Sequence, residues 1–147
     1  MQDPKPQTPN PKLSHIGIAV CDLDAAAGLY RLLGIEALHR EIIPDQGVEL
    51  MVLPVGGTRI ELLRPLSSDT PVARFIAKRG EGLHHIALEV DDIRAALDQC
   101  REAGMELLDA EPRIGAEGAL IAFLNPKSTN GVLMELVQKA ADKKFAS

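Results

Sequence analysis

The chain has 147 residues, enough for one domain or for two small halves that share a core. Apolar residues make up 46% and charged residues 25%, which is the mixture of an ordinary globular protein. A net charge of −5 argues against a nucleic-acid partner, and no apolar run reaches the roughly 18 residues of a membrane-spanning helix. Two cysteines make no disulfide framework, so we expect a reduced, cytoplasmic protein.

The two ends of the chain differ in composition from its middle. Residues 1–12 carry four prolines among polar residues and have neither an apolar core nor an arginine-rich pattern, so they predict a disordered leader rather than a targeting segment. Residues 139–147 are polar and alanine-rich, and we expect this tail to fray. The sequence therefore predicts one folded domain over residues 13–138.

Between these ends the chain repeats itself at an offset of 70 residues. The segment Leu13–Val20 aligns with Leu83–Val90, and the match continues without a gap through Asp22 and Gly34, which meet Asp92 and Gly104. Such self-similarity indicates a duplicated supersecondary unit. We expect two modules, at about 13–66 and 83–138, joined by a linking helix at about 70–80.

Each module predicts the same order of elements. A β-branched run indicates a strand, an aspartate then caps an apolar-periodic helix, and a glycine follows where a helix C-terminus requires positive φ. The expected strands are 15–20, 37–43, 49–53 and 59–63 in the first module, and 86–90, about 105–108, 120–124 and 132–137 in the second. The predicted fold class is α+β, with two tandem βαβββ modules that form a curled mixed sheet around a metal cleft.

The repeat also brings four chemically active residues into correspondence. His15 and His85 are counterparts in the first strands, and Glu61 and Glu135 are counterparts in the last strands. Two imidazoles and two carboxylates form a donor set for a divalent metal ion. Taken singly, a histidine in an apolar strand is more often a hydrogen-bonded core residue, and a glutamate is more often the exposed half of an alternating pattern.

His84 directly precedes His85, and alternation along a strand sends such neighbours to opposite faces. Correspondence with His15 selects His85 as the ligand, so we expect His84 to be a donor behind the site or a surface residue. Glu49 is a second asymmetric feature, because Ala119 stands at its repeat position. A carboxylate without a counterpart is not needed as a ligand, which makes Glu49 a candidate base, with a solvent-exposed glutamate as the alternative.

Longer motifs resemble a known enzyme family. They are His15-Ile-Gly-Ile-Ala-Val-x-Asp-Leu, Pro44-x-Gln-Gly-Val-Glu49, Glu61-Leu-Leu-x-Pro-Leu66, the segment Gly82–Ile93 and Pro126-Lys-x-x-x-Gly-Val-Leu-x-Glu-Leu136. Together they resemble the methylmalonyl-CoA epimerase family of the vicinal oxygen chelate (glyoxalase, bleomycin resistance, dioxygenase) superfamily.

The resemblance implies a cytoplasmic homodimer that acts in propionate metabolism and interconverts (2R)- and (2S)-methylmalonyl-CoA. It implies one divalent ion per subunit, with Co²⁺ favoured and Mn²⁺, Ni²⁺, Zn²⁺ or Mg²⁺ as alternatives, held by His15, Glu61, His85 and Glu135. It further implies that Glu49 and Glu135 are the acid/base pair that removes and returns the proton at C2 through a metal-stabilised enolate.

One position departs from part of the family, because some epimerases have glutamine where this chain has Glu61. Two carboxylates cancel the charge of a divalent ion, which should weaken its Lewis acidity. Glyoxalase I, a related lactoylglutathione lyase, also uses histidine and glutamate ligands, so Glu61 gives that type of enzyme some weight. Such an enzyme would use the same four ligands without needing Glu49. A metal-free binding protein of the bleomycin-resistance type is a further alternative, and an extradiol dioxygenase is less favoured because a fourth ligand would crowd its open metal positions.

Overall fold

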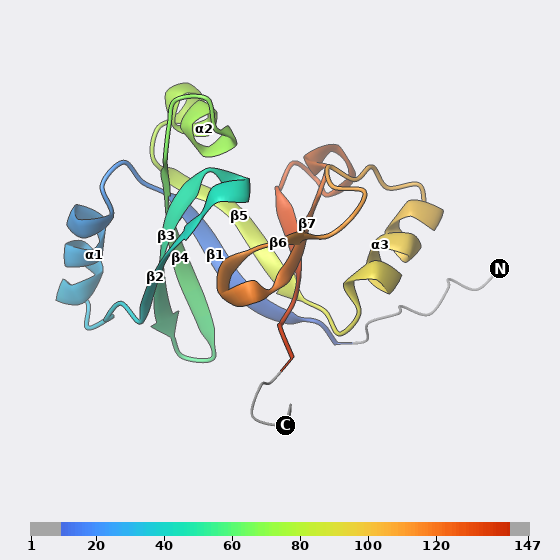
Figure 1. Cartoon of the computed structure of the whole chain (residues 1–147), viewed down its shortest axis with the longest axis horizontal. Coiled ribbons are helices and arrows are strands. Elements are labelled where there is room, and N and C mark those ends of the chain that lie inside the picture. The colour runs from blue at the N-terminus through green and yellow to red at the C-terminus, as the bar shows by residue number, and fades with distance from the viewer. Residues whose placement is uncertain (1–9, 142–147) are drawn as a thin grey trace. The chain divides into compact units, whose positions relative to one another are not determined.

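The computed structural model describes residues 10–141 and divides the chain into two units (Figure 1). The first unit runs from Leu13 to Ala87, and the described part of the second comprises residues 10–12 and 88–141. The predicted leader and tail lie largely outside the described residues. Among residues 10–141, no helix combines the length and the apolar character needed to cross a bilayer.

The first unit is a mixed sheet with two helices. Its elements are β1 (Lys12–Ala19), α1 (Leu23–Leu32), β2 (His39–Ile43), β3 (Val48–Val55), β4 (Thr58–Pro65), α2 (Pro71–Arg79) and β5 (Gly82–Glu89). The strand order is β2-β3-β4-β1-β5, with β1 parallel to β4 and with β3 antiparallel to both of its neighbours, β2 and β4. Thr70 caps α2, whose first residue is Pro71.

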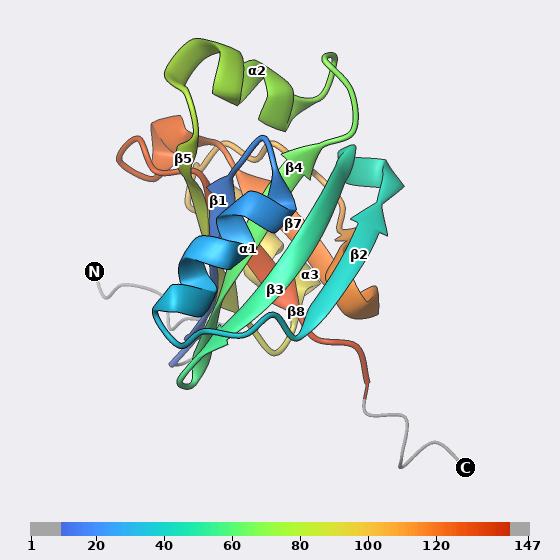
Figure 2. The same ribbon diagram turned by 90° about the vertical axis from the view of Figure 1, so that its left-hand side faces the viewer.

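The helix α1 begins and ends where its sequence dictates. The Asp22 carboxylate accepts a hydrogen bond from the Ala25 amide at 3.0 Å, and Gly34 beyond the helix has a φ of 85°. The apolar side of α1 packs on one face of the sheet (Figure 2), in a core of Val20, Leu23, Ala27, Met51, Leu53 and Leu62. This face of the sheet is therefore covered by α1.

Strand register decides which residues share the opposite face. Paired residues on neighbouring strands project to the same side of a sheet, and successive residues alternate. Gly17 pairs with Glu61 and Glu61 pairs with Val52, whereas Met51 pairs with Leu62 on the side of α1. We call the side that carries Glu61 and His15 the histidine face of the first unit.

The second unit repeats this pattern with shorter strands. Its elements are α3 (Ile93–Glu102), β6 (Arg113–Ile114), β7 (Leu120–Leu124) and β8 (Met134–Gln138), with strand order β8-β7-β6. Asp92 caps α3 by accepting from the Ala95 amide at 3.1 Å, and Gly104 has a φ of 86°. The apolar side of α3 packs against Ala122, Leu124 and Leu136, as α1 packs in the first unit.

One expected strand of the second module is wrong. Residues 105–108 form only an isolated bridge between Leu107 and Leu124, and β6 lies further along the chain. The Asp109 carboxylate accepts the Phe123 amide at 2.8 Å, where a strand would offer a backbone carbonyl. A backbone bond to β7 remains at Leu108, whose amide donates to the Phe123 carbonyl at 3.0 Å, but the side-chain bond interrupts the ladder, and regular pairing with β7 resumes at Arg113. The predicted α+β class with βαβββ in each half is nevertheless confirmed by the order of the elements.

Candidate functional site

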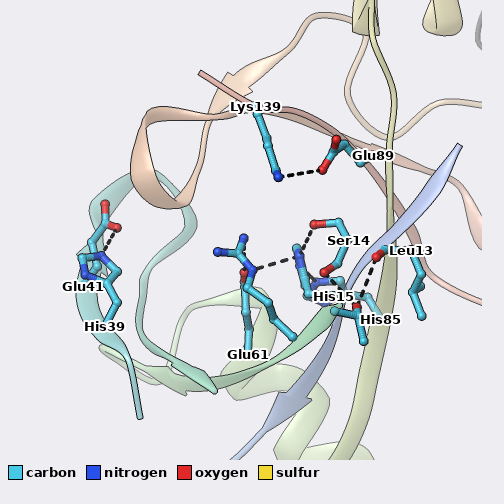
Figure 3. Close-up of polar contacts among 11 residues, drawn as sticks. Leu13, Ser14, His15, His39, Glu41, Glu61, His85, Glu89 and Lys139 are labelled. Carbon is cyan, nitrogen blue, oxygen red and sulfur yellow. Dashed lines mark hydrogen bonds and ion pairs between the residues drawn. The ribbon is translucent and has the colours of Figure 1, made fainter. Parts of the chain in front are cut away.

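Two histidines of the first unit face each other through their ring nitrogens. His15 lies on β1 and His85 on β5, and their Nε2 atoms are 3.1 Å apart, with the rings nearly perpendicular at 86° (Figure 3). Each residue is only 4% exposed. The sequence therefore places two buried imidazoles so that one nitrogen of each points at the other.

This spacing fits a shared metal ion. Ligand nitrogens that lie about 2.0–2.1 Å from one ion, at an angle between octahedral and tetrahedral, are roughly 2.9–3.4 Å apart. Burial, together with the neighbouring His15 and His84, holds the pKa of His85 well below its ordinary value of 6.5. His85 is therefore neutral at physiological pH, and neutral imidazole is the form that binds a metal.

The outer nitrogens of both rings have partners that orient the rings. Nδ1 of His15 lies 3.0 Å from Ser14 Oγ and 3.3 Å from Glu61 Oε2, and Nδ1 of His85 lies 2.9 Å from Nδ1 of His84. Contacts of this kind fix the orientation and tautomer of a ligating histidine. Glu61, predicted as a direct ligand, thus contacts the nitrogen of His15 that faces away from His85.

The surroundings of Glu61 and His84 complete this picture. Glu61 is 4% exposed, and Arg59 Nη2 lies 3.4 Å from its Oε2, which offsets part of its negative charge. The His84 ring is half-buried and packs edge-on against Phe75 with 4.9 Å between ring centres. Of the two expectations for His84, the structure agrees with a partner behind the site rather than a free surface residue.

Gly17 makes room for the His85 ring, which sequence reasoning missed. A Cβ atom built at Gly17 would overlap Cε1 and Nδ1 of the His85 imidazole. The repeat contains a signal for this, because Ala87 is the counterpart of Gly17 in an otherwise closely matched strand. A residue with a side chain at position 17 would displace the ring from its place beside His15.

Glu49 lies on the other face of the sheet from His15 and Glu61. It pairs with Arg64 on β4 and alternates with Leu50, so its side chain projects toward α1. Arg40 Nε and Arg64 Nη2 each lie 2.9 Å from its carboxylate, and Arg40 also binds Asp24 of α1 at 2.9 Å. These arginines lower the pKa of Glu49. The structure thus does not bring the predicted base together with the two histidines.

Glu135 belongs to the second unit, where it occupies the position that Glu61 has in the first. It pairs with Phe123, lies on the side of β8 that faces away from α3, and is 3% exposed. The described chain therefore contains a buried donor set suited to a metal ion, two imidazoles and one carboxylate, in His15, His85 and Glu135.

A further pair on the histidine face was missed in the sequence. His39 pairs with Val52, and Glu41 pairs with Leu50, so both side chains of β2 project to the side of Glu61. His39 Nε2 and Glu41 Oε1 are 2.8 Å apart (Figure 3). The signal was their spacing of two residues within a predicted strand, which places both on one face.

Known proteins resemble the chain over most of its length. The sequence profile of the Glyoxalase/Bleomycin resistance protein/Dioxygenase superfamily matches residues 14–123. The ethylmalonyl-CoA/methylmalonyl-CoA epimerase of Cereibacter sphaeroides is 47% identical over 130 residues, covering 86% of this chain and 97% of that protein. The mitochondrial methylmalonyl-CoA epimerase of Homo sapiens is 41% identical over 129 residues, covering 86% of this chain and 73% of that protein.

A solved structure gives the same result for the fold. It is a methylmalonyl-CoA epimerase in complex with methylmalonyl-CoA and NH4⁺, 41% identical, with a TM-score of 0.86 over 89% of this chain and 96% of that one. The resemblance to this fold family, predicted from the sequence motifs, is thereby confirmed.

Proposed function

Since the chain belongs to the glyoxalase, bleomycin resistance protein and dioxygenase superfamily, we propose that it epimerises (2R)- and (2S)-methylmalonyl-CoA. The observation that carries the proposal is 47% identity to an ethylmalonyl-CoA/methylmalonyl-CoA epimerase, 97% of which is covered. A glyoxalase or a metal-free binding protein would share the fold, and these remain the alternative functions.

The reaction requires an acidic C–H bond to be broken and remade on opposite faces of C2. Because C2 lies between a thioester and a carboxylate, the electron pair left by the proton spreads into the thioester oxygen. We propose that His15, His85, Glu61 and Glu135 serve one divalent ion, as the donor set and the spacing of the two Nε2 atoms allow. Such an ion, when bound, supplies electrostatic stabilisation for the charge that develops on the substrate oxygens.

The residues of the chain have separate roles in this proposal. His15 and His85 offer buried nitrogens, while Glu61 and His84 contact the Nδ1 atoms of the two rings. Glu135 is proposed both as a ligand and as one of the two proton-transfer groups. Glu49 faces α1 and is held by Arg40, so the geometry supplies no reason to retain it as the second group.

We also propose that the chain forms a homodimer that takes methylmalonyl-CoA as its substrate. Light scattering on the purified protein would give about twice the 15.8 kDa of one chain if this is correct. A monomer mass at micromolar concentration would refute the proposed dimer and would leave the proposed reaction unaffected.

The deciding experiment follows the proton at C2. Each epimer of methylmalonyl-CoA is incubated with the protein in D2O, with one added divalent metal or with a chelator, and NMR follows both deuterium uptake and formation of the other epimer. We expect both, and we expect the chelator to suppress them. Absence of both with every metal tried would refute the assignment, and activity on a glutathione hemithioacetal in the same preparations would favour the glyoxalase alternative.

A further inference from the structure

We propose that Glu41, held by His39, is the second proton-transfer residue at C2 of the substrate. This inference rests on the proposed epimerase function and adds a residue to its site. It answers a question that the fold raises, because an inversion requires proton-transfer groups on both sides of C2 and Glu49 faces the helix α1 instead.

Strand register places Glu41 on the correct face of the first unit. Glu41 pairs with Leu50 and Leu50 pairs with Leu63, and Leu63 is two residues beyond Glu61 on the same strand. Because paired residues share a face and alternate residues along a strand do too, Glu41 projects to the histidine face. Glu49 pairs with Ile42, one residue further along β2, and so projects to the other.

The pair is built so that the carboxylate has a defined position. His39 Nε2 lies 2.8 Å from Glu41 Oε1, and the side chains are 41% and 29% exposed, which leaves Glu41 within reach of a bound molecule. Between them in sequence, Arg40 points to the opposite face and binds Asp24 of α1 and Glu49 of β3, each at 2.9 Å. The strand that carries the pair is thus tied from behind to a helix and to its neighbouring strand.

A transverse row of the sheet connects this pair to the two buried histidines. The row runs from His39 through Val52 and Glu61 to Gly17, above which the His85 ring lies. Neighbouring strands are about 4.8 Å apart, so β2 and β4 are separated by roughly 10 Å. That span suits the reacting portion of a small thioester, with an imidazole pair at one end and a carboxylate at the other.

The residues between the two ends are apolar and buried. Val52 is 0% exposed and Leu50 is 2% exposed, and both project to the histidine face beside Glu61 and Glu41. An apolar floor leaves few partners for water, and electrostatic interactions act more strongly where water is excluded. Glu41 stands at the edge of this apolar stretch with 29% of its side chain exposed, so its carboxylate can meet a molecule bound there.

The chemical step is balanced within the substrate and two carboxylates. The C2–H bond breaks, an O–H bond forms on Glu41, and the electron pair left at C2 moves into the thioester carbonyl. The second group, for which Glu135 is proposed, then gives its proton to the other face of C2, so that its O–H bond breaks and a new C–H bond forms. Proton exchange of both carboxyl groups with water restores the starting state before the next turnover. The reverse reaction uses the same groups with their roles exchanged, so no oxidant or further reactant is needed.

The test compares Glu41→Gln with Glu36→Gln, which changes an exposed carboxylate that lies 3.8 Å from Arg31. Each epimer is incubated separately in D2O, and epimerisation and deuterium uptake are measured by NMR. For Glu41→Gln we expect epimerisation to fall by about 100-fold or more, while deuterium uptake persists from the one epimer whose proton faces the remaining group. Glu36→Gln should match the wild type.

His39 is a positioning residue in this proposal, and His39→Gln tests it. We expect kcat to fall by about 10-fold with KM within about two-fold of the wild type, because substrate binding does not use His39. Metal content and thermal unfolding of each variant show whether it is folded and loaded.

Three results would overturn the role of Glu41. If Glu41→Gln epimerises the substrate at a rate within two-fold of the wild type, Glu41 is not a proton-transfer residue. Equal loss of deuterium uptake from both epimers, or loss of metal, would make the residue structural. A wild-type protein that epimerises nothing would overturn the proposed function and this role with it.

Discussion

The imidazole of His85 occupies the space that a side chain at Gly17 would fill. A Cβ atom at position 17 would overlap the ring, and Gly17 is the neighbour of Glu61 across β1 and β4. The second module has Ala87 at this position, so the two halves of the repeat differ where the ring lies. The absence of a side chain at Gly17 on β1 thus leaves the space that the His85 ring of β5 occupies.

Gly17→Ala should therefore damage the metal site more than the fold. The added methyl group must push the His85 ring away from His15 Nε2, so we expect metal affinity to fall by roughly 10–100-fold, as for a displaced partner of a ligand. Calorimetric titration with Mn²⁺ or Co²⁺ measures the change. Gly28→Ala is the matched control, because its Cβ meets nothing within 4 Å. It lies inside α1, where alanine should raise stability by about 0.5–1 kcal/mol without changing metal affinity. Equal affinities in the two variants would contradict the steric account.

His15→Ala should remove metal binding, because it deletes one of the two facing nitrogens. We expect the affinity to fall by more than about 100-fold, since loss of an outer partner of a ligand alone costs about 10–100-fold. Ser14→Ala keeps the ligand and removes the contact to its Nδ1, so its loss should be smaller, about 10-fold or less. Elemental analysis of the purified variants and titration with one metal give both values. A His15→Ala protein that retains stoichiometric metal would exclude His15 as a ligand.

Glu49→Gln distinguishes the sequence prediction from the structure. The sequence prediction makes Glu49 a base, whose loss would abolish epimerisation. The structure pairs it with Arg40 and Arg64 on the face covered by α1, so we expect epimerisation to be retained and thermal stability to fall. Because arginines lower the pKa of Glu49, its contribution to stability is present above its ordinary value of 4.5 and is lost as the pH falls below it. The variant should therefore differ most from the wild type near neutral pH and least in acid, when thermal unfolding is followed across this range.

The duplication made much of the fold predictable. A repeat offset of 70 residues aligned His15 with His85, and both aspartate caps and both glycines that follow the helices have the predicted geometry. These features are local, because a cap or a positive φ depends on a few adjacent residues. The contact between the two histidines joins residues that are far apart in the sequence. The repeat still identified the pair, because aligning the two modules shows equivalent positions and requires no knowledge of contacts.

What the sequence did not reveal depends on strand register and on single side chains. The strand predicted at 105–108 fails because one carboxylate, that of Asp109, takes an amide of β7. Glu49 was recognised as an asymmetric acid, but its face is set by its pairing with Arg64, which the sequence does not state. A register shift of one residue moves every side chain of a strand to the opposite face. Only the register of β2 and β3 therefore shows that Glu41 and Glu49 lie on opposite faces of the sheet.

The buried His85 should make the metal-free protein sensitive to acid. Burial and two neighbouring histidines lower the pKa of His85 well below 6.5, whereas the unfolded chain takes up its proton near that value. Below about pH 6.5 the unfolded state therefore binds a proton that the folded state does not, and stability falls with pH by up to about 1.4 kcal/mol per unit. Urea unfolding in the presence of a chelator, between pH 5 and 7.5, should show a weaker pH dependence for His85→Gln than for the wild type. Identical slopes for His85→Gln and the wild type would show that His85 is not the source.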